Sequence, residues 1–490
     1  MQESKHQKKI DPKVSILCLL VSLLLKKKYL CSEFEKRFLS HHVVDYQNKK
    51  GLDINLSGKA LLSAESIEPQ LFAIQPTDFI GLLPRLLVHE GDSVKVGTPL
   101  FHNKHDERIQ VVAPVSGTVS AILRGPKRRL DAIVIASDGK YESLEYNIGT
   151  LDADTIRQLL LESGLWALIR QRPYSIVANP DQSPKAFFIS AFDSAPLAPD
   201  LDFVIEHFPE SFQKGLDILS ILSDKKLHLC VHAPKTQSEV FLKARNVNLH
   251  RFSGPHPSGN IGTQINKIDP IGKGDTVWYC APQDVVNIGR FFSTGRLDFT
   301  RIFAAAGSSL LQPHYFKTRL GAPVKAMVDD GTKDNCRFIS GNVLTGTKTD
   351  KDGFVGFYHN MITVIPEGDQ RHEMLGWIWP GFFKFSVSRT FPSGFVPPVL
   401  HPSFELDTNM HGEIRPFVVT GKFESVFPFD IYPLQLIKAC MVEDIDLMEN
   451  LGIYEVDEED FALCEFIDTS KNNIQQIIRK GLDLMRRENE

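Results

Sequence analysis

The sequence has few cysteines, no excess of basic residues and no long apolar run, and each shortage excludes a class of protein. Seven cysteines are scattered over 490 residues without a C-x-x-C pair, which argues against a disulfide framework and a cysteine-rich zinc site. A formal net charge of -5 provides no chain-wide positive field, so nucleic acid is not an expected partner. The membrane-like run at residues 14–25 is shorter than the about 20 residues that cross a bilayer.

Catalytic motifs of hydrolases are also missing, since the chain contains neither G-x-S-x-G nor H-E-x-x-H. The acidic run at 458–460 is expected to be solvated and to begin a helix, and an acid/base pair is not expected there. His228, Cys230 and His232 alternate along a predicted strand and therefore share one face. No fourth ligand lies nearby in the sequence, so we predict no metal site.

Two hairpin-like segments stand out in the first third of the chain. Residues 86–101 and 111–122 alternate apolar and polar positions around turns, which is typical of β-hairpins. Their strings E-G-D-x-V-x-x-G-x-x-L and A-P-x-S-G-x-V resemble the biotinyl/lipoyl barrel-sandwich module. That module carries its prosthetic group on a lysine at the hairpin tip, and Lys104 is the candidate here, although its spacing from Ala113 differs from that in the carriers. A carrier protein modified at Lys104 is therefore the alternative function, and a solvated lysine on a tight turn is the favoured interpretation.

Helix and strand patterns alternate through residues 151–297, which favours an α/β layer with a parallel sheet. Its clearest strands are expected at 186–189, 227–231 and 277–280. The glycine-containing stretch 253–263 does not match G-x-G-x-x-G, and no strand directly precedes it in the usual register. We therefore predict a structural turn there, and not a nucleotide cradle.

The rest of the chain changes character twice. Residues 298–366 return to short strands around one helix, with strands expected at 322–328 and 361–365, which favours a small β-grasp unit. Residues 367–490 are rich in Phe and Pro before they become helical, and Ser470 is the predicted N-cap of the last helix.

The expected fold class is therefore multidomain α/β and α+β. At 490 residues, about three or four domains are expected. In chain order we predict an N-terminal extension (1–48), a lipoyl-like barrel-sandwich unit (49–150), a Rossmann-like α/β layer (151–297), a β-grasp unit of the SLBB type (298–366) and a C-terminal helical domain (367–490).

This order of domains resembles the A subunit of the Na+-translocating NADH:quinone reductase. The same architecture relates that family to the C subunit of Rnf-type complexes and to the FMN-carrying subunit of complex I. The resemblance covers about residues 49–465, and the extension before it has no counterpart. The best-matching strings are 50–53 (KGLD), 90–92 (EGD), 113–119 (APVSGTV), 124–128 (RGPKR), 256–263 (HPSGNIGT), 376–381 (GWIWPG), 384–386 (KFS) and 389–391 (RTF).

The flavin loop of these relatives is altered in this sequence. The relatives hold FMN through a glycine-rich loop and an acidic string, whose positions here are 164–170 (GLWALIR) and 190–196 (SAFDSAP). Glycines let a flavin phosphate approach backbone amides closely, which Trp166, Leu168 and Ile169 obstruct. The resemblance therefore implies a flavin site that side chains have filled.

The iron–sulfur motif of the Rnf-type relatives has changed in the same direction. C-x-x-C-G-x-C-x-x-x-C-P aligns with 417–428, where Phe417, Thr420, Phe423 and Phe427 replace the four thiolates. The ligand positions of a second copy are Glu458, Phe461, Cys464 and Asp468. One cysteine cannot hold a cubane that needs four, so we expect a packed core in place of the clusters.

The resemblance implies a peripheral subunit with no catalytic residue, cofactor or metal of its own, in a translocase that couples NADH oxidation and ubiquinone reduction to Na+ export. NADH, ubiquinone, flavins, iron–sulfur clusters and Na+ would be handled by the complex, whose other subunits and ubiquinone are the expected partners. The expected location is the cytoplasmic face of the bacterial inner membrane. The candidate quinone or partner surface, for which an ordinary core is the alternative, is the aromatic run Trp377, Trp379, Phe382, Phe383 and Phe385.

Overall fold

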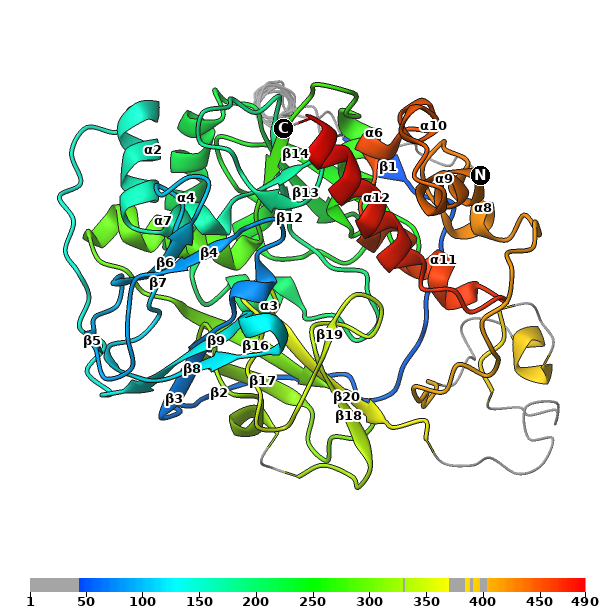
Figure 1. Cartoon of the computed structure of the whole chain (residues 1–490), viewed down its shortest axis with the longest axis horizontal. Coiled ribbons are helices and arrows are strands. Elements are labelled where there is room, and N and C mark those ends of the chain that lie inside the picture. Colours follow the sequence, from blue (N-terminus) through cyan, green and yellow to red (C-terminus); the bar gives the residue numbers. More distant parts are fainter. Residues whose placement is uncertain (1–43, 329–330, 370–383, 388–390, 397–402, 490) are drawn as a thin grey trace, which may run out of the picture. The chain divides into compact units, whose positions relative to one another are not determined.

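The computed structural model describes residues 44–328, 331–369, 384–387, 391–396 and 403–489 (Figure 1). Within these residues, no helix combines the length and the apolar character that a membrane crossing requires.

A seven-stranded sheet forms the α/β layer, in the order β1-β14-β13-β12-β15-β10-β11. Strands β14, β13, β12 and β15 are parallel, and β10 and β11 close one side in antiparallel orientation. The strands are β1 (Val44–Gln47), β10 (Arg170–Arg172), β11 (Ile176–Val177), β12 (Phe187–Ser190), β13 (Leu227–His232), β14 (Asn248–Ser253) and β15 (Val277–Tyr279). The three strands predicted in this layer are therefore confirmed, whereas β1 lies within the segment predicted as an extension.

Helices α3 to α7 follow the parallel strands, as the alternating pattern predicts, and α2 precedes the sheet's strand β10. The main ones are α2 (Ala153–Glu162), α3 (Leu201–Ile205), α4 (Pro209–Leu222), α5 (Glu239–Leu242), α6 (Ile261–Ile268) and α7 (Pro282–Thr294). Helix α7 shows why these boundaries form. Pro282 occupies its first turn, Asp284 accepts a hydrogen bond from the Ala281 amide (3.0 Å), and Gly295 ends the helix with φ +69°.

The barrel-sandwich unit consists of two small sheets. Its strands are β3 (Leu71–Ile74), β4 (Pro84–Leu86), β5 (Ser93–Val94), β6 (Pro99–Asn103), β7 (Gln110–Val112), β8 (Gly117–Arg124) and β9 (Leu130–Ser137). Sheet β3-β9-β8-β5 faces sheet β4-β6-β7, and alternate apolar residues from both fill the core between them.

A six-stranded sheet makes the β-grasp unit, in the order β19-β18-β20-β16-β17-β2. Its strands are β2 (Leu61–Ser66), β16 (Thr300–Ala306), β17 (His314–Arg319), β18 (Cys336–Ser340), β19 (Thr347–Thr349) and β20 (Met361–Pro366). The predicted strand at 361–365 is confirmed. The one at 322–328 is wrong, because Val324–Met327 forms a 3-10 turn. Strand β2 joins from the barrel-sandwich region of the sequence.

The C-terminal domain packs five helices around its own core. They are α8 (Phe423–Val426), α9 (Pro433–Met441), α10 (Ile445–Asn450), α11 (Ala462–Ile467) and α12 (Ile474–Asn489). One apolar stripe of α12 is fully buried, namely Ile474, Ile478, Leu482 and Met485. The prediction that Ser470 caps this helix is wrong. Ser470 lies four residues before the first residue of α12, and its hydroxyl donates to the Pro416 carbonyl (2.9 Å).

Candidate functional site

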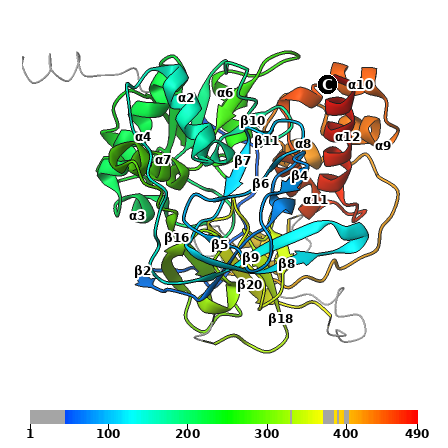
Figure 2. The same ribbon diagram turned by 60° about the vertical axis from the view of Figure 1, so that its left-hand side comes forward.

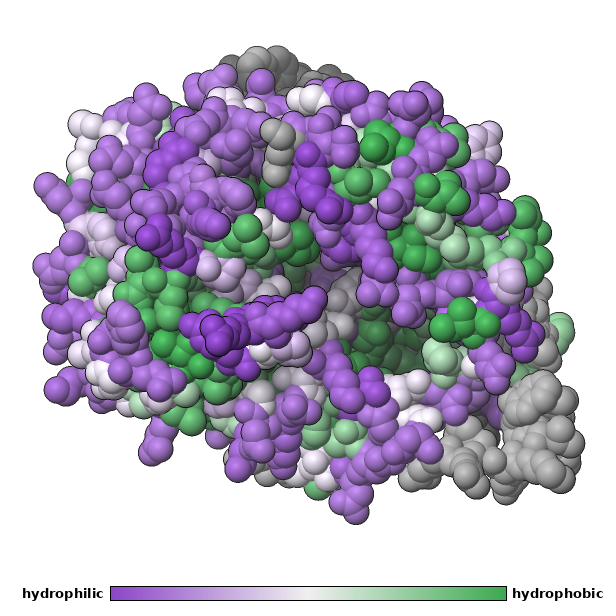
Figure 3. Space-filling view, in the orientation of Figure 1, coloured by the Kyte–Doolittle hydropathy of each residue, from purple (hydrophilic) through white to green (hydrophobic). Residues whose placement is uncertain are grey.

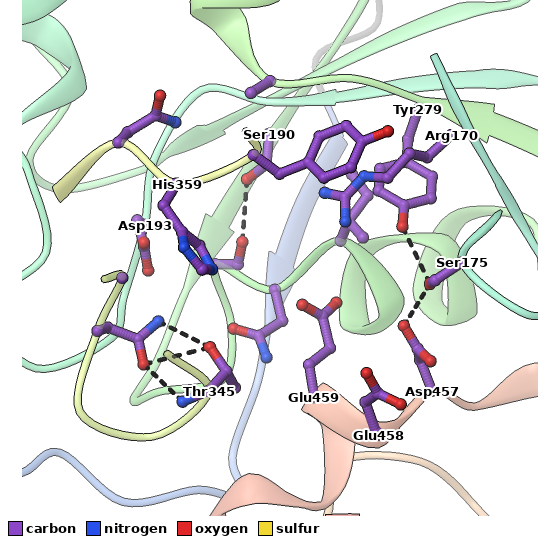
Figure 4. Close-up of a pocket in the computed structure, with 18 of the residues that line it drawn as sticks. Arg170, Ser175, Ser190, Asp193, Tyr279, Thr345, His359, Asp457, Glu458 and Glu459 are labelled. Atoms are coloured by element: carbon purple, nitrogen blue, oxygen red, sulfur yellow. Dashed lines mark hydrogen bonds between the residues drawn. The ribbon is translucent and has the colours of Figure 1, made fainter. Parts of the chain in front are cut away.

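A cavity of about 600 Å³ lies at the carboxyl ends of the parallel strands. Strand β12 pairs with β13 on one side and β15 on the other, so the chain reverses direction along the sheet between β12 and β15. Such switch points leave a crevice where ligands bind in open α/β sheets. Ser190 ends β12 and Tyr279 ends β15, and both side chains line the cavity (Figure 4).

The α/β layer, the barrel-sandwich unit, the β-grasp unit and the C-terminal helical segment all contribute to the walls. Asp78 comes from the barrel-sandwich unit, Thr345 and His359 from the β-grasp unit, and Glu459 from the C-terminal domain. The surface is hollowed between helix α12 and strand β19, which is the mouth of this cavity (Figure 3). The site is therefore defined by how the domains meet, and by no single motif.

Arg170 supplies a positive charge to the cavity. Its guanidinium lies between the rings of Tyr279 and Tyr358, at 4.7 and 4.5 Å from their centroids. Both tyrosine hydroxyls are engaged elsewhere, since Tyr279 donates to Ser175 Oγ (3.0 Å) and Tyr358 donates to the Ala167 carbonyl (2.7 Å). No described residue accepts a hydrogen bond from the guanidinium of Arg170, whose donors are directed at the cavity space.

A second arginine binds the acidic run of the C-terminal domain. Arg172 is fully buried and forms ion pairs with Glu459, Asp460 (2.7 Å) and Asp457 (3.8 Å). The prediction of a solvated acidic run is therefore wrong, because a buried cation 288 residues away requires these carboxylates. Burial raises the pKa of Asp460 to about 7, and burial together with the charge of Asp457 raises the pKa of Glu458 to about 8.

Two histidines of the wall are neutral at physiological pH. Burial lowers the pKa of His256 and of His359 to about 4. Each ring Nδ1 contacts a serine hydroxyl, His256 that of Ser194 (3.0 Å) and His359 that of Ser340 (2.8 Å). Carboxylates and two arginines, Arg170 and the ion-paired Arg479, therefore dominate the charge of the site, and the imidazoles offer hydrogen bonds without charge.

The stretch 253–263 lies in this wall as well. It connects β14 directly to α6, so the prediction that no strand precedes it is wrong. The Gly259 amide donates to Ser194 Oγ (2.8 Å), and a Cβ at Gly259 would lie 2.5 Å from the Ser194 amide nitrogen. Glycine is required here for close packing of two backbone segments.

The altered flavin loop belongs to the hydrophobic core. Residues 165–168 form a buried 3-10 turn, and the Trp166 indole donates to the Ala178 carbonyl (2.7 Å). Trp166 also meets Trp278 edge to face, with ring centroids 5.3 Å apart.

The positions that align with the iron–sulfur motif are partly packed together. Phe423, Phe427, Phe461 and Cys464 are all buried in the C-terminal core, whereas Thr420 is exposed. The rings of Phe427 and Phe461 lie 4.7 Å apart. In two-cluster ferredoxins the fourth cysteine of one motif ligates the cluster of the other. In the alignment with the Rnf-type motif, Phe427 takes that fourth position and Phe461 belongs to the second motif.

The aromatic surface predicted from the sequence is largely untested. Trp377, Trp379, Phe382 and Phe383 lie outside the described residues. Phe385 is half-buried and packs against Phe404 and Phe466, at 5.3 and 5.6 Å between ring centroids.

The remaining sequence candidates lie away from the cavity. Lys104 is exposed between β6 and β7. His228 Nδ1 lies 2.8 Å from His250 Nε2, a partner that its strand pattern did not reveal. In the described part of the chain, no three His, Cys, Asp or Glu residues are grouped as metal ligands would be.

The architecture defines a class of multidomain proteins that combine barrel-sandwich, α/β and SLBB units. Three family models match in order: the NqrA N-terminal barrel-sandwich hybrid domain at 47–138, the NqrA second alpha/beta domain at 151–297 and the NQRA C-terminal (SLBB) domain at 302–351. The chain belongs to the NqrA family, the A subunits of the Na+-translocating NADH-quinone reductase, and is thus a component of an enzyme complex.

Curated relatives extend this match over nearly their whole length. The A subunit of the Na+-translocating NADH-quinone reductase from Neisseria meningitidis serogroup B is 38% identical over 452 residues, 90% of this chain and 99% of the relative. The corresponding proteins from Yersinia pseudotuberculosis and Rhodopirellula baltica are 37% and 38% identical, with 99% and 98% of their lengths covered. A solved NAD+-reducing NiFe-hydrogenase is 14% identical with a TM-score of 0.32 over 44% of this chain and 47% of that chain, too distant to support an inference.

Proposed function

We propose that this chain is a peripheral subunit, without flavin, cluster or metal of its own, of a complex that couples NADH oxidation and ubiquinone reduction to Na+ export. The observation that supports this most directly is the contact of Phe427 with Phe461, where side chains fill the space that a cluster would need. Other subunits then hold the flavins, the clusters and the Na+ path, at the cytoplasmic face of the bacterial inner membrane.

Within this role we propose that the cavity binds the head group of ubiquinone. Its volume of about 600 Å³ lies within the range of small-molecule sites. Arg170 faces it with unused donors, which suit a quinone carbonyl oxygen, and Phe192 adds an apolar wall. Arg170 would orient the ring, and its charge would stabilise the oxygen as electrons arrive from a partner protein. Phe385 and its aromatic neighbours in the sequence remain the alternative surface for the quinone.

Equilibrium binding of a short-chain ubiquinone to the purified chain tests this proposal. We expect Arg170→Gln to weaken binding about tenfold, the cost of one good hydrogen bond to a charged donor. Arg296→Gln is the matched control, because Arg296 lies on the surface outside the cavity lining. Equal binding by the parent and both variants would show that ubiquinone does not bind in this cavity.

The carrier alternative makes a different prediction at Lys104. Its exposure at the turn between β6 and β7 leaves the ammonium accessible to modification. A lipoyl or biotinyl group would add a discrete increment to the intact mass, which Lys104→Arg would remove. We expect the unmodified mass.

A further inference from the structure

The turn between strands β8 and β9 concentrates positive charge that the proposed function does not use. The two strands pair antiparallel from Gly117↔Ser137 to Arg124↔Leu130, and the ribbon runs outward to its turn (Figure 2). The Gly125 amide donates to the Arg129 carbonyl (2.9 Å) and closes the turn. This segment contains the string 124–128 that contributes to the family resemblance.

Most of the charge at this turn is uncompensated. Arg124, Lys127, Arg128 and Arg129 are all exposed. Arg129 pairs with Asp131 (2.7 Å), and no described acidic residue pairs with the other three. The chain as a whole is negative, with a formal charge of -5, so this turn is a local reversal of its field.

The backbone of the turn favours other residues than these cations. Lys127 and Arg128 have φ values of +56° and +60°. Consecutive left-handed residues at a hairpin turn are ordinarily Asn-Gly or Asp-Gly, because side chains with a full Cβ are strained there. The cations are therefore kept at a conformational cost, and like-charge repulsion between them adds to it.

We propose that the β8–β9 turn is a docking surface for anionic lipid head groups. Adjacent basic residues with no acidic partner attract a diffuse negative surface. Leu123, whose side chain is 48% exposed beside Arg124, supplies an apolar group at the same tip, as shallow contact with a bilayer requires. The negative remainder of the chain is repelled by the same lipids, so the turn would also orient the whole molecule.

Vesicle flotation of the full chain tests this surface. The vesicles contain phosphatidylcholine with phosphatidylglycerol at 3:1, or phosphatidylcholine alone. The variant is Lys127→Gln with Arg128→Gln. The matched control is Lys225→Gln with Lys226→Gln, an exposed lysine pair at a turn of the α/β layer. Melting curves of both variants establish that they are folded.

Each cation near an anionic bilayer contributes about fivefold to partitioning, so we expect an about 25-fold loss in the turn variant, which removes two. The control pair should bind like the parent, and 0.5 M NaCl should abolish the difference by screening. The proposal would be overturned if the turn variant and the control variant bound anionic vesicles equally. It would also be overturned if the parent bound neutral vesicles as well as anionic ones. A turn variant that keeps lipid binding but fails to co-purify with partner subunits would assign the turn to a protein.

Discussion

Truncating Phe427 to Ala tests whether the C-terminal domain has replaced a redox centre with a hydrophobic core. The Phe427 side chain is 1% exposed and lies 4.7 Å from Phe461 and 5.1 Å from Phe429 between ring centroids. The variant loses the transfer energy of a buried ring and leaves a cavity lined by the two neighbouring rings. Substitutions of this kind cost about 3–5 kcal/mol. The total free energy of unfolding of a domain is about 5–15 kcal/mol, so we expect a large fraction of this domain's stability to be lost.

The measurement is thermal unfolding of the purified full chain, together with NADH:quinone activity of the reconstituted complex. For a unit of 60–100 residues, a loss of 1 kcal/mol in the free energy of unfolding lowers the melting temperature by about 4–8 °C. The melting temperature of the C-terminal domain should therefore fall by about 10 °C or more. Activity should fall only in proportion to the folded chain. Phe395→Ala is the matched control, because Phe395 is 73% exposed and its truncation leaves no buried cavity. A Phe427→Ala variant as stable as the parent but unable to support electron transfer would refute the structural role.

Three other predictions concern iron, pH and the N-terminal boundary. The anaerobically purified chain should hold no stoichiometric iron or sulfide by metal analysis, and Cys464→Ser should leave its visible spectrum unchanged. Glu458→Gln should raise the melting temperature above pH 8 and hardly at pH 4.5. The pKa of Glu458 is raised to about 8 in the folded state, so between these pH values the unfolded chain ionises this carboxyl while the folded chain keeps it protonated; the parent therefore loses stability as the pH rises, whereas Gln stays neutral. Removing residues 1–43 should leave the melting curve unchanged, whereas removal through 48 should lower it, because Tyr46 stacks on Phe252 (4.9 Å) in the sheet.

Local sequence patterns predicted the helices and strands, and the order of the domains predicted the family. Strands such as β12 and β13 are short, apolar and bounded by turn residues, so their signal lies within a few neighbours. The errors occur where distant segments decide the outcome. Strand β2 pairs with β17 about 250 residues later in the chain, and a pairing of this range has no local signal.

The candidate site was missed for the same reason. The sequence pointed to an aromatic run as the surface and treated 253–263 as a structural turn, but the cavity is lined by that stretch, by Arg170 and by carboxylates of the last domain. Charged residues on a chain are ordinarily solvated, and only the buried position of Arg172 shows that the run at 458–460 is structural.

The ion pair of Arg172 with Asp460 also determines the order in which parts of the molecule can fold during synthesis. The two residues are 288 positions apart, so a ribosome that adds roughly 5–20 residues per second needs about a quarter of a minute to one minute between them. During that interval the nascent α/β layer holds a cation whose counter-charges do not yet exist. Its edge must stay hydrated, and the cavity wall can close only when the last helices leave the ribosome. A chain that stops early would therefore present this edge, still open, to proteases and chaperones.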